Sequence, residues 1–186
     1  LNMINNVEVN ESKLVFSVPD DGCEFLDSSL GSHSVVPHGA TMPLLSSTEK
    51  KFGKSSVFFG SPEQSDGAAN FAVQWSKDWD FGDNDFTIEF WLKFTDGHVY
   101  GASGDEEHLV SIFQAPNWEI YYSKSAGLMA SVIVNGEPKI VSYSRNYPDS
   151  PIFAPAQGLW HEWKDDTWYH VAFEKKGAKL TLYIGG

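Results

Sequence analysis

Alternation of apolar and polar residues is strongest between residues 86 and 94. The apolar positions of this segment are Phe86, Ile88, Phe90, Leu92 and Phe94, and the positions between them are Thr87, Glu89, Trp91 and Lys93. Because successive side chains of a β-strand point to opposite faces, the pattern predicts a strand with one apolar and one polar face. An apolar strand face needs a second sheet to cover it, so the segment indicates a β-sandwich.

Shorter runs with the composition of strands occur along the rest of the chain. They cover residues 14–16, 56–59, 71–73, 108–113, 118–122, 128–134, 139–143, 168–173 and 180–184. β-Branched and aromatic residues, which favour strands, are frequent in these runs. No segment has the pattern of a long helix, so the sequence predicts an all-β protein.

Two dipeptides that contain glycine predict tight turns between neighbouring runs. Asn135-Gly136 lies between residues 128–134 and 139–143, and Lys176-Gly177 lies between residues 168–173 and 180–184. Glycine and asparagine adopt positive φ at little cost, as two-residue hairpin loops require. We therefore expect a β-hairpin at each of these two places.

Length and charge limit the organisation of the chain and its partners. The 186 residues are predicted to form a linker at residues 1–12 and one sandwich domain at residues 13–186. With 25 acidic and 13 basic residues, the formal net charge of −12 repels nucleic acid and anionic lipid surfaces. The chain has no apolar run of about 18 residues, so membrane insertion is not expected. The single cysteine, Cys23, cannot form an intrachain disulfide.

The segment Phe81-Gly82-Asp83-Asn84-Asp85-Phe86-Thr87-Ile88-Glu89-Phe90-Trp91 resembles a motif of laminin-G-like domains in the concanavalin A-like lectin/glucanase superfamily. The similar type is the jelly-roll domain found in phage structural proteins and bacterial surface proteins. Residues 27–40, 50–59 and 167–173, and then 180–186, are similar to further family segments in the same order. The resemblance implies a two-sheet antiparallel β-sandwich with concanavalin A-like jelly-roll topology.

The resemblance also implies closing strands that the chain does not contain. In the family, a few dozen residues follow the hairpin that corresponds to residues 167–186. We therefore expect the domain to continue beyond residue 186, with this chain as a fragment. The alternative is that a neighbouring chain supplies the missing strands, because a long unpaired sheet edge favours association.

A calcium site is a further implication of the resemblance. Many domains of the family hold Ca²⁺ with a carboxylate from the opening loop, and Asp27 matches that position. Calcium takes six to eight oxygen ligands, which acidic loops can offer. The usual Gly-Asn-Gly of the family is replaced here by Leu30-Gly31-Ser32. The alternative role of Asp27 is to cap a turn.

Aromatic residues in or beside the predicted loops are candidates for glycan binding, because sugars stack their C–H faces on aromatic rings. The candidates are Trp160, Trp163, Trp118, Tyr121, Tyr147 and Trp91. Trp91 belongs to this set because it lies on the polar face of its strand. The alternative role is core packing, which we expect for about two in three of these rings. We also expect His170 to be a core histidine.

Carboxylates with catalytic spacing are absent along each predicted strand. Retaining glycoside hydrolysis needs two carboxyl groups about 5–5.5 Å apart, but Glu89, Glu119 and Glu174 have no acidic neighbour on their own strand faces. We therefore expect a non-catalytic carbohydrate-binding or adhesion module on the exterior of a virion (phage tail, fibre or capsid) or of a cell, with a cell-surface glycan as ligand. The alternative is a structural module that contacts other virion or surface proteins, or further copies of itself. A glycoside hydrolase is the third and weakest reading.

Overall fold

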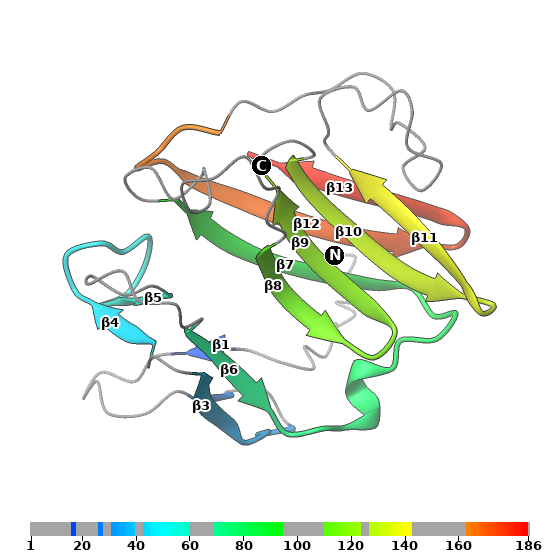
Figure 1. Ribbon diagram of the computed structural model, residues 1–186, viewed down its shortest axis with the longest axis horizontal. Coiled ribbons are helices and arrows are strands. Elements are labelled where there is room, and N and C mark those ends of the chain that lie inside the picture. The colour runs from blue at the N-terminus through cyan, green and yellow to red at the C-terminus, as the bar shows by residue number, and fades with distance from the viewer. Residues whose placement is uncertain are drawn as a thin grey trace, which may run out of the picture. The chain divides into compact units, whose positions relative to one another are not determined.

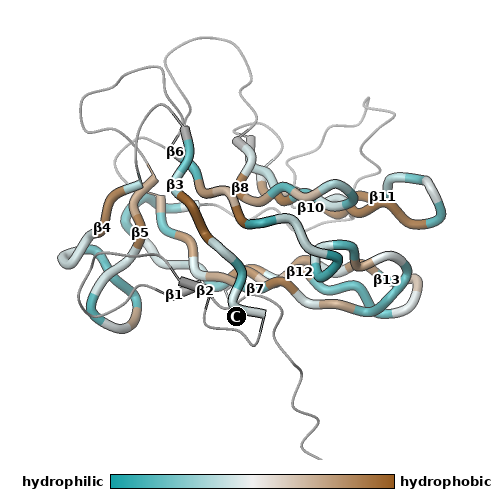
Figure 2. The backbone as a smooth tube through the Cα atoms, turned by 90° about the horizontal axis from the view of Figure 1, so that it is seen from below, coloured by the Kyte–Doolittle hydropathy of each residue, from teal (hydrophilic) through white to brown (hydrophobic). Residues whose placement is uncertain are grey.

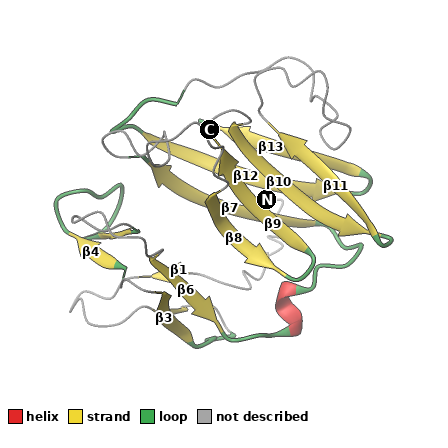
Figure 3. Cartoon of the chain, in the orientation of Figure 1, coloured by secondary structure: helices red, strands yellow, loops and turns green. Residues whose placement is uncertain are grey.

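The computed structural model describes residues 16–17, 26–27, 31–39, 43–59, 69–94, 110–123, 127–142 and 163–185. These residues form antiparallel β-strands and one short 3₁₀ helix, η1 (Lys77–Trp79), so the described chain is all-β (Figures 1 and 3). None of them forms a helix with the length and hydrophobicity needed to cross a bilayer. The chain divides into two compact units, Leu1–Asp78 and Trp79–Gly186.

The first unit contains three two-stranded antiparallel sheets among its described residues. Their strands are β1 (Phe16–Ser17) with β2 (Leu26–Asp27), β3 (Val35–Gly39) with β6 (Ala69–Val73), and β4 (Leu44–Ser46) with β5 (Ser56–Phe58). Strand β4 was not expected from the sequence pattern. His33 Nε2 lies 3.1 Å from Asp78 Oδ2, which links the start of β3 to the end of this unit.

The second unit is a two-sheet antiparallel sandwich. Its strands are β7 (Phe86–Lys93), β8 (Val110–Ala115), β9 (Trp118–Ser123), β10 (Gly127–Val134), β11 (Glu137–Ser142), β12 (Trp168–Lys176) and β13 (Lys179–Ile184). One sheet has the strand order β11-β10-β9-β8 and the other has the order β13-β12-β7. Figure 2 shows the layers edge-on, with β8, β10 and β11 in one and β7, β12 and β13 in the other.

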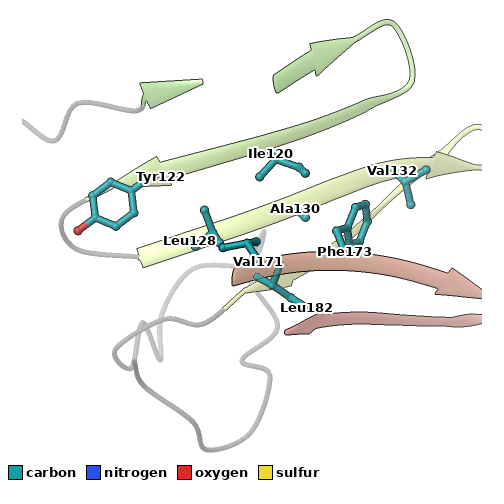
Figure 4. Close-up of a cluster of buried hydrophobic side chains, with 8 residues drawn as sticks. All are labelled: Ile120, Tyr122, Leu128, Ala130, Val132, Val171, Phe173 and Leu182. Carbon is teal, nitrogen blue, oxygen red and sulfur yellow. The ribbon is translucent and has the colours of Figure 1, made fainter. Parts of the chain in front are cut away.

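The core lies between these two sheets. Its buried members are Ile120, Tyr122, Leu128, Ala130 and Val132 from one sheet and Val171, Phe173 and Leu182 from the other (Figure 4). The five apolar residues of the alternating segment, Phe86 to Phe94, all pack against this cluster. The predicted apolar face of residues 86–94 and the sandwich that it requires are therefore confirmed.

Both expected hairpins are present. Asn135 and Gly136 have φ of 53° and 78° and form the loop between β10 and β11, where Val134 pairs with Glu137. In the second hairpin Lys176 pairs with Lys179, so the loop is Gly177-Ala178, one residue later than the predicted dipeptide. Proline and asparagine at 116–117 join β8 to β9 in a third hairpin, which the sequence reading did not single out.

The motif at residues 81–85 is held against the β12–β13 hairpin. Lys175 is only 3% exposed. Its Nζ donates hydrogen bonds to the carbonyl oxygens of Asp83 at 2.6 Å and Asn84 at 3.2 Å. Asp85 Oδ1 accepts a hydrogen bond from the Gly177 amide at 2.7 Å. The Gly-, Asp- and Asn-rich turn thus fixes the direction in which β7 enters its sheet.

Candidate functional site

The outward side of the three-stranded sheet carries a mixed aromatic and polar surface, which we call the Trp91 face. It consists of Thr87, Glu89, Trp91, His170, Ala172, Glu174, Thr181 and Tyr183. These residues alternate with those that face the core, so the pleat of the strands turns them away from it. Strand pairing places Trp91 beside His170, and Ala172 between Glu89 and Tyr183.

Trp91, His170 and Glu89 are in contact on this face. The rings of Trp91 and His170 have centroids 5.1 Å apart and planes tilted by 34°. His170 Nε2 lies 3.5 Å from Glu89 Oε2, with the His170 side chain 28% exposed and the Glu89 side chain 67% exposed. Trp91 itself is 38% exposed. The expectation of a core role for His170 is wrong, because the pairing of β12 with β7 puts its side chain on the outward face.

The other half of the face is formed by Tyr183 and Glu174. The Tyr183 hydroxyl donates a hydrogen bond to Glu174 Oε2 at 3.2 Å, and Tyr183 is 46% exposed. Thr87 and Thr181 flank Glu174 on the neighbouring strands. At the opposite end, Lys93 Nζ lies 3.3 Å from Asp166 Oδ1, with only 8% of the Lys93 side chain exposed.

This arrangement offers an indole surface beside several hydrogen-bonding groups. Apolar C–H faces of a ligand can pack on Trp91, while the carboxylates accept hydrogen bonds and the Tyr and Thr hydroxyls both donate and accept. A sheet face is a rigid support, because its backbone hydrogen bonds lie within the sheet. The Trp91 face is therefore suited to binding a polyhydroxylated ligand.

Glu89 and Glu174 also lie on this one face, although each lacks an acidic neighbour on its own strand. The pairing of Glu89 with Ala172 makes Glu174 its diagonal neighbour across the sheet, and diagonal neighbours are about 7–8 Å apart. Sequence reasoning missed this relation because it depends on the register between strands more than 80 positions apart, as the pairing of Glu89 with Ala172 shows.

Two of the sequence candidates, Trp118 and Trp163, pack against the core. Trp118 stacks on Phe81, with centroids 5.4 Å apart and planes 19° apart, and its Nε1 donates to the Trp79 carbonyl oxygen at 2.9 Å. Trp163 makes edge contacts with Phe94 at 5.4 Å and Tyr169 at 4.7 Å. Both rings thus have the packing role that we gave as the alternative to glycan binding.

Tyr121 lies on the outward side of the four-stranded sheet, away from Trp91. It pairs with Met129 and follows Glu119 by two residues on the same strand face. Burial raises the pKa of the Tyr121 hydroxyl, and the Glu119 carboxylate raises it further. The structure therefore separates Tyr121 from Trp91 onto the two outer faces of the sandwich.

The remaining sequence candidates are not brought to the Trp91 face. Trp160 and Tyr147 lie outside the described residues. Asp27 is in β2, where its backbone pairs with Phe16. Within the described part of the chain, no three or more His, Cys, Asp or Glu residues gather in a group that would hold a metal ion.

Comparison of this chain with protein-family models, with curated proteins and with solved structures found no match. The laminin-G-like resemblance therefore rests on the sequence motifs alone.

Proposed function

We propose that this protein is a non-catalytic carbohydrate-binding or adhesion module of the laminin-G-like type, with jelly-roll topology, on the exterior of a virion or cell. Its ligand is a cell-surface glycan, and its binding site is the Trp91 face. The observation that carries the proposal is the partly exposed Trp91 ring, which lies beside His170 on a sheet face that also carries Glu89 and Tyr183.

The contacts of Trp91 support a binding role. An indole that is 38% exposed keeps part of its surface available to a ligand, while its contact with His170 holds the ring in place. A group that is already ordered loses little conformational entropy when a ligand binds, which favours affinity. Trp91 therefore combines an accessible aromatic surface with a fixed orientation.

A glycan array tests the proposal with wild-type protein and the Trp91→Ala variant. We expect the wild type to bind at least one class of glycan and the variant to lose at least about tenfold in affinity, or about 1.4 kcal/mol. Ile133→Ala is the matched control, because Ile133 is 43% exposed on β10 in the other sheet and should not affect binding. An array without ligands for the wild type, or equal loss in both variants, contradicts the proposal.

Calcium is the cofactor implied by the resemblance, and its proposed ligand is Asp27. Calorimetric titration with Ca²⁺ compares the wild type with Asp27→Ala. Heat of binding that is present in the wild type and lost in the variant supports this part of the proposal. No heat in either protein removes calcium from it without affecting the Trp91 face.

A second candidate function is a structural module that contacts other virion or surface proteins, or copies of itself. Exposed aromatic residues in the first unit favour it, with Phe52 66% exposed and Phe59 55% exposed. Contiguous exposed apolar surface is typical of interaction sites, and Phe59 packs edge-on against Phe71 with ring centroids 5.3 Å apart. Light scattering tests this role. We expect the wild type to self-associate and a Phe52→Ser, Phe59→Ser double variant to lose that self-association.

A further inference from the structure

The Trp91 face has a distinct charge distribution around Ala172. Glu89 and Glu174 place two carboxylates there, and the Glu89 side chain is 67% exposed. At one end of the face, the Lys93 ammonium lies 3.3 Å from an Asp166 carboxylate oxygen, so its charge is compensated. Acidic groups therefore dominate the centre of the face, with His170 as the basic group beside Glu89.

Two exposed lysines lie at the hairpin end of the same side of the sheet. Lys176 and Lys179 pair with each other. Lys176 is four residues along β12 from Ala172, the partner of Glu89, but only two residues from Glu174, which is about 13 Å and about 7 Å at the rise of a β-strand. Charges in solvent are screened over about 8 Å at physiological ionic strength. These lysines therefore offset the charge of Glu174 in part and leave the charge of Glu89 beside Ala172 in place.

Aromatic rings add to the attraction for a cation on this face. Trp91 and Tyr183 are 38% and 46% exposed, and the faces of Trp and Tyr rings attract ammonium groups. Trp91 and Glu89 are two residues apart on one strand face, about 7 Å along β7. A ligand ammonium near Ala172 is thus within reach of both an indole ring and a carboxylate.

We propose that the Trp91 face prefers glycans that carry free amino groups, as in deacetylated amino-sugar polymers, over their neutral or acidic counterparts. This inference rests on the proposed function and specifies the ligand class of the same site. Charge-assisted hydrogen bonds from an ammonium to Glu89 or Glu174 are about twice as strong as neutral ones. The net charge of −12 also attracts cationic chains to the protein and repels acidic glycans.

The test compares binding of glucosamine oligomers with binding of N-acetylglucosamine oligomers of equal length, which differ in the charge on nitrogen. For the wild type we expect the glucosamine oligomer to bind at least about tenfold more tightly. Glu89→Gln and Glu174→Gln should each reduce this preference severalfold, because they remove the negative charge and keep the shape of the side chain. Glu137→Gln is the matched control, because it removes one exposed carboxylate from the hairpin of the other sheet.

Each result separates the inference from the function on which it rests. Equal or tighter binding of the acetylated oligomer overturns the inference and leaves the glycan-binding proposal standing. A preference that survives in both the Glu89 and Glu174 variants, or that falls equally in the Glu137 variant, overturns its assignment to this face. Failure of the wild type to bind either oligomer overturns the inference, and failure on the whole glycan array overturns the proposed function as well.

Discussion

Lys175 is a charged residue that is buried on the core-facing side of β12. Its ammonium donates to the carbonyl oxygens of Asp83 and Asn84, and these bonds replace the hydration that burial removes. Burial of a charge costs free energy unless hydrogen bonds compensate it. The two carbonyl groups are therefore the reason that a lysine is tolerated at this position.

Substitution of Lys175 by methionine tests this account. Methionine keeps most of the side-chain volume but removes the donor, and hydrogen bonds to charged groups contribute about 1.5–3 kcal/mol. We expect Lys175→Met to lower the free energy of unfolding by this amount in urea titrations. Lys176→Met changes the neighbouring exposed lysine and should stay within about 0.5 kcal/mol of wild type. Similar free energies of unfolding for the two variants would show that the contact of Lys175 with Asp83 and Asn84 adds little to stability.

The Tyr121 hydroxyl gives a pH-dependent prediction. Burial, and then the negative charge of Glu119, raise the pKa of Tyr121 above its usual value of about 10 in the folded protein. The folded state therefore holds this proton more tightly than the unfolded state. Its contribution to stability is fully present below about pH 10 and is lost as the pH rises through the folded pKa.

Alkaline titration of tyrosine absorbance measures this effect. The difference between the titration curves of the wild type and of Tyr121→Phe should show one tyrosine that ionises at a higher pH than an exposed tyrosine does. Glu119→Gln should move this ionisation to lower pH only in part, because burial is the larger of the two causes. A difference spectrum that titrates at the usual pH of tyrosine, or that shifts fully in Glu119→Gln, would contradict this order of causes.

The hairpin between β10 and β11 depends on backbone conformation and not on side-chain contacts. Gly136 has φ of 78°, and a Cβ atom built there meets no atom within 4 Å. Any loss of stability on substitution therefore reports the strain of positive φ, which costs about 1–2 kcal/mol for an ordinary residue.

We expect Gly136→Ala to lower the free energy of unfolding by about 1–2 kcal/mol in urea titrations. Gly136→Asn is the control, because asparagine tolerates the left-handed region better than alanine does. The asparagine variant should therefore lose clearly less free energy of unfolding than the alanine variant. An alanine variant as stable as the wild type would mean that the loop relaxes to a different turn.

Local pattern was sufficient to predict the strands of the second unit and two of its hairpins, but not the β8–β9 hairpin or the composition of the Trp91 face. Residues 86–94 alternate strictly, and Asn135-Gly136 has the chemistry of a two-residue loop, so both features are encoded within a few positions. The neighbours of Glu89 are set by the pairing of β7 with β12, which depends on the whole sandwich. His170 was misassigned for the same reason, since alternation alone does not say which side of β12 faces the core.

The two units differ in how their described residues are packed. All eight buried members of the core cluster lie in the second unit, whereas the described strands of the first unit form two-stranded sheets. A two-stranded hairpin alone is marginally stable in water. The sequence prediction of one domain over residues 13–186 accordingly requires a single cooperative unfolding transition, and two separate transitions in calorimetry would contradict it.

The net charge of −12 predicts how the stability of the protein responds to salt. An excess of like charge destabilises the compact state through self-repulsion, and raising the ionic strength from about 0.01 M to about 1 M shortens the screening length from about 30 Å to about 3 Å. Screening also weakens ion pairs, but a solvent-exposed pair contributes only about 0–1 kcal/mol. We therefore expect the midpoint of thermal unfolding at neutral pH to rise with sodium chloride.

The rise should shrink as the pH approaches the value at which acidic and basic charges balance, because the repulsion disappears there. A midpoint that falls with salt at neutral pH would show that the ion pairs outweigh the repulsion, and an equal rise at both pH values would show that salt acts through apolar burial instead.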